Sequence, residues 1–318
     1  MTKTRVAVIG AGSFGRHHLR VLQASPNAEL AGVIDQDQNR ATSAAAEFAC
    51  PAYQSLAELR GKVEAAVIAV PTSAHADTGC ALLEAGIDVL VEKPIASDLA
   101  SAQRLVETAA RHGRILQVGH LERFNPAIVA LKKIVTLPLF FEVHRLSLFS
   151  PRALDVDVVL DLMIHDLDIV LDLAGAMPEE IRAAGISILS DRVDIANVRL
   201  AFPGGCVANL TASRVSTERV RKLRLFQPHQ YISLDYQKQD AVVFTVSGNQ
   251  QIGFQPLLVT KEEPLRLEVE SFLEAVANRS RPVVSGEDGL RALDIALAIL
   301  AKIEEHAKVV ARQIQALP

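Results

Sequence analysis

The stretch from Arg5 to Gly15 constrains the fold of this chain more than any other. A short apolar run ends in the pattern Gly10-x-Gly12-x-x-Gly15, and a segment of helical character follows. In this context Gly10 permits a tight turn, Gly12 lets a pyrophosphate approach the backbone, and Gly15 lets the helix lie close to the strand. The helix N-terminus offers unpaired N–H groups to phosphates. The stretch predicts a dinucleotide-binding turn, and the alternative is a βαβ unit that binds no ligand.

A second strand, from Glu29 to Asp35, ends in a carboxylate 20 positions after Gly15. A carboxylate at this place accepts hydrogen bonds from the adenosine ribose hydroxyls and repels a 2′-phosphate. Arg40 is the nearest cation downstream, and we expect it to lie too far along the chain to reverse that preference. The second strand therefore favours NAD over NADP.

The order of strand-like and helix-like segments predicts two domains. Residues 5–120 alternate between the two types, which is typical of a parallel sheet with crossover helices. Strand-like runs then follow one another from 139 to 246, and helical patterns cover 156–174, 269–277 and 289–314. We expect an α/β protein with a doubly wound parallel sheet of the Rossmann type over 1–122. An α+β domain with an open, mostly antiparallel sheet then covers 123–318.

Composition and charge indicate which classes of partner the protein binds and in which compartment it is found. The net charge of −4 and the lack of a basic block argue against binding to nucleic acid or an anionic membrane. The start of the chain shows no signal-peptide pattern, and no apolar run is long enough to span a membrane. The three cysteines are widely spaced without a CxxC pattern, so we expect no disulfide and no metal site. These features predict a cytoplasmic protein.

The strand Asp88–Val91 leads into Glu92-Lys93-Pro94. The edge formed by the carboxyl ends of parallel strands is where ligands of doubly wound sheets bind. A lysine at this edge can donate to a substrate hydroxyl or carbonyl and assist proton transfer. The alternative is a surface lysine that follows a strand.

Four polar residues recur through the helical pattern of 156–174. Asp161, His165, Asp168 and Asp172 stand at i, i+4, i+7 and i+11, which places them on one strip of the helix. A histidine flanked by carboxylates can take a hydroxyl proton, and Asp161 can orient its ring. A solvated acidic face and a divalent metal site are the two alternatives.

Four motifs together make the chain resemble the Gfo/Idh/MocA oxidoreductases along its length. They are the glycine turn, Glu92-Lys93-Pro94, Arg123-Phe-Asn-Pro126 and Asp161-x-x-x-His165-x-x-Asp168. The resemblance implies a Rossmann domain and an open-sheet domain, with the nicotinamide at their junction. It also implies hydride transfer at a sugar or cyclitol carbon, and homodimers or homotetramers built through the sheet. By position, His165 would be the acid/base, Lys93 would polarise the substrate oxygen, and Asp161 would support them.

Three further stretches, 118–126, 150–154 and 208–214, are similar to a narrower branch, the UDP-N-acetylglucosamine 3-dehydrogenases. That branch forms a 3-keto nucleotide sugar. One departure from the family is Val158-Val-Leu160, where many members carry glycines, and it predicts a narrower pocket or a shifted helix start. The alternatives are an inositol or free-sugar dehydrogenase and a non-catalytic protein that binds a dinucleotide as a sensor.

The resulting candidate sites fall into two sets besides the catalytic residues. Expected cofactor contacts are Gly10, Gly12, Ser13, Phe14, Gly15, Asp35, Pro71, Thr72, His75, Glu92, Lys93 and Pro94. Expected contacts to the sugar or its diphosphate are His120, Arg123, Asn125, Arg152, Asp168 and Arg214, with Arg219 as a further cation.

Overall fold

The computed structural model describes residues 3–149, 156–248 and 251–315, and these divide into two compact units. The first unit comprises residues 1–121 and 263–290, and the second comprises 122–262 and 291–318. The expected boundary near 122 therefore coincides with that of the units, but residues 263–290 differ from the expectation. Their helix α7 (Pro264–Asn278) buries Val269, Phe272 and Leu273 in the apolar core of the first unit. This burial explains why a late segment of the chain belongs with the early one.

The first unit is built on a five-stranded parallel sheet in the order β2-β1-β3-β4-β5. Its strands are β1 (Thr4–Ile9), β2 (Ala28–Ile34), β3 (Ala65–Ile68), β4 (Asp88–Glu92) and β5 (Leu116–Gly119). Its other helices are α1 (Ser13–Ala24), α2 (Gln38–Glu47), α3 (His75–Glu84) and α4 (Leu99–His112), with short 3₁₀ turns η1 (Leu56–Leu59) and η2 (Thr72–Ala74). Because β2 and β3 lie on opposite sides of β1, the sheet has its switch point there.

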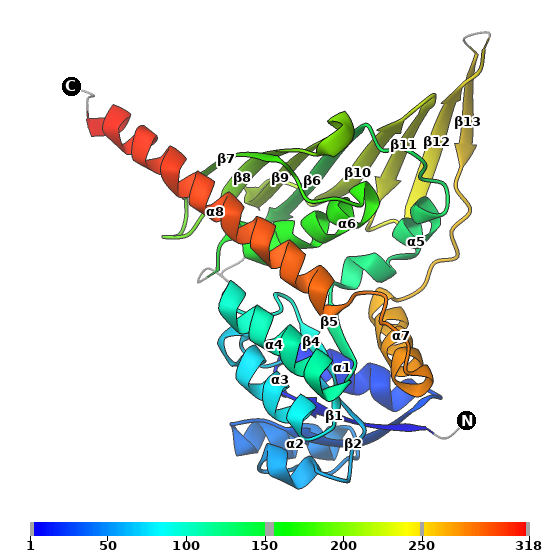
Figure 1. Cartoon of the computed structure of the whole chain (residues 1–318), viewed down its shortest axis with the longest axis vertical. Helices are drawn as coiled ribbons and strands as arrows, with labels where there is room; N and C mark the ends of the chain where they lie inside the picture. The colour runs from blue at the N-terminus through cyan, green and yellow to red at the C-terminus, as the bar shows by residue number, and fades with distance from the viewer. Residues whose placement is uncertain (1–2, 150–155, 249–250, 316–318) are drawn as a thin grey trace. The chain divides into compact units, whose positions relative to one another are not determined.

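Local sequence explains these elements. The strands are continuous apolar runs because a parallel sheet is covered on both faces, and Val6, Val8 and Val67 are fully buried. Helix α4 starts where the Asp98 carboxylate accepts from the Ser101 N–H at 2.8 Å, and it ends at Gly113 with φ of 59°. Helices α1 and α7 share one core cluster with β1 and β3 (Figure 1).

The second unit is built on an eight-stranded sheet in the order β13-β12-β11-β10-β6-β9-β8-β7. All neighbours are antiparallel except β6 and β9. The strands are β6 (Phe140–Leu148), β7 (Glu180–Ile186), β8 (Ile195–Ala201), β9 (Val207–Ser216), β10 (Val220–Gln227), β11 (Gln230–Asp235), β12 (Asp240–Val246) and β13 (Ile252–Pro256). The mostly antiparallel sheet is confirmed, including the turn η5 (Pro203–Gly205) between β8 and β9. Strand β13 was not anticipated from the sequence.

The two faces of this sheet differ. One face packs on α5 (Pro126–Lys132), α6 (Ile164–Ala174) and the part of α8 (Gly286–Gln315) that belongs to the second unit. Figure 1 shows α6 and α8 running across that face. Alternation along β10 to β12 points Leu225, Ile232 and Val243 to the helices. The other face carries a ladder of aromatic rings from β6 to β13, with neighbouring centroids 4.7 to 5.8 Å apart: Phe140, Phe226, Tyr231, Phe244 and Phe254.

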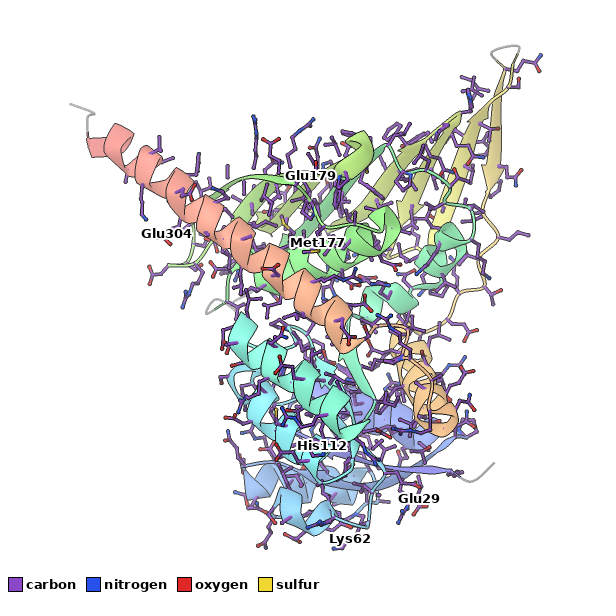
Figure 2. The ribbon with its side chains drawn as sticks, viewed as in Figure 1. Glu29, Lys62, His112, Met177, Glu179 and Glu304 are labelled. Atoms are coloured by element: carbon purple, nitrogen blue, oxygen red, sulfur yellow. The ribbon has the colours of Figure 1, made fainter. Side chains whose placement is uncertain are left out.

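Charged side chains extend from the periphery of each unit (Figure 2). Glu29, Lys62 and His112 are exposed in the first unit, and Glu179 and Glu304 are exposed in the second. Within the described residues, every helix is too short or too polar to cross a membrane.

Candidate functional site

The glycine turn has the geometry that each of its glycines was expected to provide. Gly10 has a φ of +100°, and a Cβ there would lie 2.5 Å from the carbonyl oxygen of Ala69. A Cβ at Gly15 would lie 1.8 Å from the Gly10 carbonyl oxygen, so α1 can lie this close to the turn only with glycine there. By contrast, no described atom lies within 4 Å of the Cβ position of Gly12. Space is therefore open at the one glycine that would meet a phosphate.

A cleft of about 790 Å³ opens at this turn, wholly within the first unit. It is lined by six of the expected cofactor residues: Gly10, Gly12, Ser13, Phe14, Asp35 and Pro71. Gln54, Ser55 and Leu56 also line it, from the connection between α2 and β3. These three residues were not predicted, because no motif in the sequence marks that connection. The remaining expected contacts are not among the lining residues: Gly15, Thr72, His75, Glu92, Lys93 and Pro94.

Asp35 lies in the cleft with its carboxylate held by the backbone. Its Oδ2 accepts from the Ala11 N–H and its Oδ1 accepts from the Asp37 N–H, both at 2.8 Å. Arg40 also lines the cleft, and its Nε lies 3.7 Å from Asp35 Oδ1. The expectation that Arg40 lies too far along the chain is therefore wrong, because α2 folds it back over the end of β2. Asp35 still presents negative charge where a 2′-phosphate would lie.

The ends of β3 and β4 are tied together by a buried histidine. His75 is 1% exposed, and its Nδ1 and Nε2 lie 2.9 and 3.0 Å from the carbonyl oxygens of Pro94 and Val70. Burial lowers the pKa of His75, although these contacts act in the opposite direction. We had expected a direct cofactor contact, but both ring nitrogens face backbone carbonyls. His75 therefore positions the loop that follows β3 and the loop that follows β4. The half-buried Lys93 directly precedes Pro94 in the second of these loops.

Glu92 was expected to contact the cofactor, but its carboxylate contacts His18 and the main chain of Lys93. Its Oε1 lies 2.7 Å from His18 Nε2, and its Oε2 accepts from the Lys93 N–H at 3.3 Å. His18 lies on the inner face of α1 and is fully buried. Its spacing of three from Gly15 and four from Leu22 could have revealed that it faces the sheet.

His18, Glu92 and Glu268 have the donor types of a metal site, and one ligand atom from each lies within 4.8 Å of the others. In the structure, however, His18 Nε2 and Glu92 Oε1 bind one another at 2.7 Å. We therefore treat His18 and Glu92 as a hydrogen-bonded pair, with the Glu268 carboxyl group beside it. Glu268 was not predicted from the sequence, although it lies on the buried side of α7 together with Val269 and Phe272.

In the second unit, Asp161 and His165 lie at the start of the helical segment. A π-helical turn, η4 (Val159–Met163), contains Asp161, and α6 follows directly with His165. Both side chains are half-buried. Val158 and Val159 are fully buried in the core of this unit. They fill the core, and the segment begins with a π turn, a feature frequent at functional sites.

Three expected substrate contacts are buried and have their polar groups engaged inside the second unit. Arg123 donates to both Asp168 oxygens at 2.7 and 3.0 Å, and the two residues are 6% and 1% exposed. Arg123 also pairs with Asp172 at 2.9 Å. Asn125, 2% exposed, caps α5 by accepting from the Ala127 N–H at 3.1 Å. These contacts correct the interpretation of all three residues as substrate contacts, because their polar groups are engaged beneath the surface.

The other expected substrate contacts differ in how exposed their side chains are. Arg214 is 5% exposed and donates to the carbonyl oxygens of Val156 and Val193, so it holds the segment before η4 and is not an open cation. His120 is 1% exposed in the first unit. Arg219 is exposed between β9 and β10. Arg152 lies outside the residues that the structure describes.

A second buried network anchors α6. Arg145 on β6 donates to both Asp166 oxygens at 2.6 and 2.8 Å and to Glu122 at 2.9 Å. The Tyr236 ring lies 5.1 Å from its guanidinium carbon, and burial is the main reason that the pKa of Tyr236 is raised well above its usual value. Because Asp166 adjoins His165, this network determines where His165 stands.

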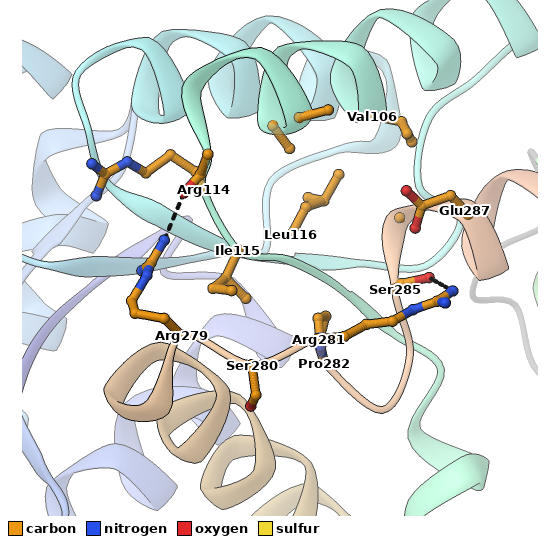
Figure 3. A pocket seen from close by; sticks show the side chains of 14 residues that line it. Val106, Arg114, Ile115, Leu116, Arg279, Ser280, Arg281, Pro282, Ser285 and Glu287 are labelled. Atoms are coloured by element: carbon orange, nitrogen blue, oxygen red, sulfur yellow. Dashed lines mark hydrogen bonds between the residues drawn. The ribbon is translucent and has the colours of Figure 1, made fainter.

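A second hollow in the first unit measures about 600 Å³ and contains three arginines (Figure 3). Arg114 donates to the Gly86 carbonyl, Arg279 to the Gly113 carbonyl and to Asp88, and Arg281 to Ser285 Oγ. In Figure 3 the Arg114 and Arg281 side chains point away from each other. Since each guanidinium has a local partner, we assign no ligand here.

Comparison with known proteins agrees with this geometry. Residues 4–120 match the model of an oxidoreductase family with an NAD-binding Rossmann fold, and residues 143–228 match the C-terminal domain of the same Gfo/Idh/MocA proteins. A UDP-N-acetylglucosamine 3-dehydrogenase of Acidithiobacillus ferrooxidans is 36% identical over 96% of this chain and 98% of its own. The chain belongs to the Gfo/Idh/MocA family. It is therefore an oxidoreductase with NAD as its cofactor, as the sequence predicted.

Other members of the family are more distant. A myo-inositol 2-dehydrogenase of Thermotoga maritima is 28% identical over 96% of this chain and 98% of its own. The scyllo-inositol 2-dehydrogenase (NAD(+)) of Bacillus subtilis is 26% identical over 93% of each. The solved structure of the A. ferrooxidans enzyme superposes with a TM-score of 0.91 and covers 96% of this chain and 99% of that one. The likeness to that enzyme therefore extends through both units.

Proposed function

We propose that this Gfo/Idh/MocA protein is an NAD-dependent dehydrogenase that oxidises a ring hydroxyl of a nucleotide sugar to a ketone. The first candidate substrate is UDP-N-acetylglucosamine, oxidised at C3. The observation that carries the proposal is the 36% identity to a UDP-N-acetylglucosamine 3-dehydrogenase across nearly the whole of both chains. Inositol dehydrogenases that align over 93 to 96% of this chain are 25 to 28% identical, and those that are 30 to 33% identical align over only 54% of it, which favours the nucleotide sugar.

The catalytic roles follow from residue chemistry. His165 is the base that takes the proton of the substrate hydroxyl, because an imidazole changes charge near neutral pH. Asp161, four residues earlier, stabilises the imidazolium that forms. Lys93 donates to the same substrate oxygen and favours the alkoxide-like transition state. NAD, which Gly12 and Asp35 would hold, would supply the acceptor for the hydride that leaves the substrate carbon.

The cleft at the glycine turn would hold the adenosine and pyrophosphate of NAD. Gly12 and the N-terminus of α1 face the phosphates, since the space above Gly12 is open. Asp35 would accept from the ribose hydroxyls with its remaining lone pairs. Arg40, beside Asp35, would lie against the adenosine.

Recognition of the diphosphate requires a cation that is accessible. Burial of Arg123 and Arg214 in local contacts removes two of the expected cations. Arg219 remains exposed, and we propose it as a diphosphate contact.

The aromatic ladder on the open face of the second unit supports self-association. Phe226 and Phe254 are 37% and 65% exposed within it, and aromatic rings are enriched in protein interfaces. We propose a homodimer or homotetramer built through this face. Strand β11 lies inside the sheet, so it contributes only its face. The free cysteines, two of them buried, fit a cytoplasmic location.

The test is NADH absorbance with purified protein, NAD and UDP-N-acetylglucosamine, with a ketone trap because 3-keto formation is uphill. A substrate-dependent rise supports the proposal. The His165→Asn variant should bind NAD with the wild-type Kd and lose turnover, and Lys93→Met should lose turnover as well. A flat trace with the nucleotide sugar and a rise with an inositol would make the protein an inositol dehydrogenase. Binding of NAD with no turnover on any substrate would indicate a sensor.

A further inference from the structure

Three elements of the first unit bring together a buried cluster of ionisable side chains. His18 comes from α1, Glu92 from the end of β4 and Glu268 from α7. One nitrogen or oxygen atom of each lies within 4.8 Å of the others. His18 and Glu268 are 0% and 1% exposed. Charged groups are rarely buried to this extent without a partner.

Glu92 is the member whose contacts are complete. Its carboxylate lies between His18 Nε2 at 2.7 Å and the Lys93 N–H at 3.3 Å. A Cβ at Gly119 would lie 3.1 Å from Glu92 Oε2, so the carboxylate packs directly against β5. Burial opposes its charge, but His18 and Lys93 outweigh burial and lower the pKa of Glu92. Glu92 is thus an anion that links His18 to the main chain of Lys93.

Glu268, unlike Glu92, is buried without a hydrogen-bond partner for its carboxyl group among the described residues. Neither of its carboxyl oxygens has a hydrogen-bond partner among the described residues, and neither does His18 Nδ1. Burial and the negative charge of Glu92 raise the pKa of Glu268 well above its usual range. An ionised carboxylate here would be a second buried anion with no donor, whereas a neutral carboxyl carries an O–H that can donate. Two acceptors belong to the cluster, the Glu92 carboxylate and His18 Nδ1.

We propose that Glu268, as a neutral carboxylic acid, and His18 share their protons with Glu92 and so act as positioning residues for Lys93. The hydrogen bonds of the cluster then keep the Glu92–Lys93 backbone in place. The effect on Lys93 matters for catalysis only if the proposed function is correct. The state of the cluster itself is independent of any substrate.

The first test is the thermal stability of the full chain as a function of pH, with Glu268→Gln as the variant. The variant suits this test because glutamine is nearly isosteric with glutamate and cannot ionise. A carboxyl whose folded pKa is raised loses stability as pH rises above its unfolded pKa of about 4.3. The Tm of Glu268→Gln relative to wild type should therefore increase from roughly pH 5 to roughly pH 8.

Glu274→Gln is the matched control, since Glu274 lies on the same helix and is exposed. Its Tm difference should stay constant with pH. If Glu268→Gln instead lowers the Tm more at the higher pH, Glu268 is ionised and paired, and the proposal is wrong. A Zn²⁺-dependent rise in wild-type Tm that Glu268→Gln abolishes would also overturn it, because the cluster would then hold a cation in place of the proton.

The second test measures Lys93 directly. Acetylation of Lys93 by acetic anhydride, quantified by mass spectrometry against Lys62, reports its environment without a substrate. His18→Gln should change the acetylation rate of Lys93 by about threefold or more, because it disturbs the contact that holds the Glu92 carboxylate next to Lys93. His17→Gln, a change at the exposed neighbour on the same helix, should leave the rate unchanged. Equal Lys93 rates in the two variants would refute the positioning role, whether or not the nucleotide sugar is the substrate.

Discussion

Removal of Arg145 should destabilise the second unit severely, and the structure allows the size of the effect to be worked out. Arg145 is 2% exposed and donates three charge-assisted hydrogen bonds, two to Asp166 and one to Glu122. Arg145→Met keeps most of the side-chain volume but leaves two carboxylates buried without their main cation. Loss of one partner from a buried ion pair costs about 3–5 kcal/mol. That is a large fraction of the stability of a typical domain.

The matched control is Arg182→Met. Arg182 pairs with Glu180 at 2.5 Å, but its side chain is 77% exposed, and such pairs contribute about 0–1 kcal/mol. The double variant Arg145→Met, Asp166→Asn should recover part of the loss, because it removes one of the two unpaired charges. Since α6 also carries His165, the single variant should lower kcat as well.

The assay is urea unfolding followed by far-UV circular dichroism and by tyrosine fluorescence, because the chain has three tyrosines and no tryptophan. Tyr231 and Tyr236 lie in the second unit and Tyr53 in the first, so most of the fluorescence signal reports the unit that changes. A loss below about 1 kcal/mol, or one equal to that of Arg182→Met, would refute the reasoning that burial makes this ion pair indispensable.

Three other perturbations test the cofactor cleft and a buried carboxylate. Gly15→Ala should lower the Tm and weaken NAD binding, because the new Cβ would lie 1.8 Å from the Gly10 carbonyl oxygen. Gly12→Ala should leave the Tm unchanged and raise only the Kd for NAD. Scanning and titration calorimetry of both variants measure these two quantities. Asp35→Asn should raise the ratio of kcat/KM for NADP to kcat/KM for NAD by about tenfold, because Arg40 Nε lies 3.7 Å from Asp35 and can bind a 2′-phosphate. An unchanged ratio would contradict the role of Asp35 in excluding NADP. Burial opposes the charge of Asp194, but hydrogen bonds from the backbone N–H groups of residues 188–190 and from the Ser190 hydroxyl lower its pKa to about 2. The ionised Asp194 therefore stabilises the fold above about pH 4, and this contribution is lost as the pH falls toward 2. Asp194→Asn should lower the free energy of unfolding by about 2–3 kcal/mol at neutral pH and by little in acid, as measured by urea unfolding at several pH values.

Patterns local in the sequence determined the architecture and the cofactor turn. The apolar runs and the spacing of Gly10, Gly12 and Gly15 are short-range features, and each has one physical use in a βαβ unit. The end of α6 at Gly175, with φ of 66°, follows in the same way from the conformational freedom of glycine. Asp161 and His165 were found because helical spacing alone places them on one side.

Tertiary structure decided which polar residues are accessible. Arg123 and Asp168 have the types and the place of substrate contacts, but they lie on different elements that pack together, so each neutralises the other in the interior. Arg40 was judged too far from Asp35 because distance along the chain ignores the fold of α2. The cluster of His18, Glu92 and Glu268 joins α1, β4 and α7, whose separation in sequence hides their contact. A side chain's charge is written in the sequence, whereas its burial and its partners depend on elements far apart along the chain.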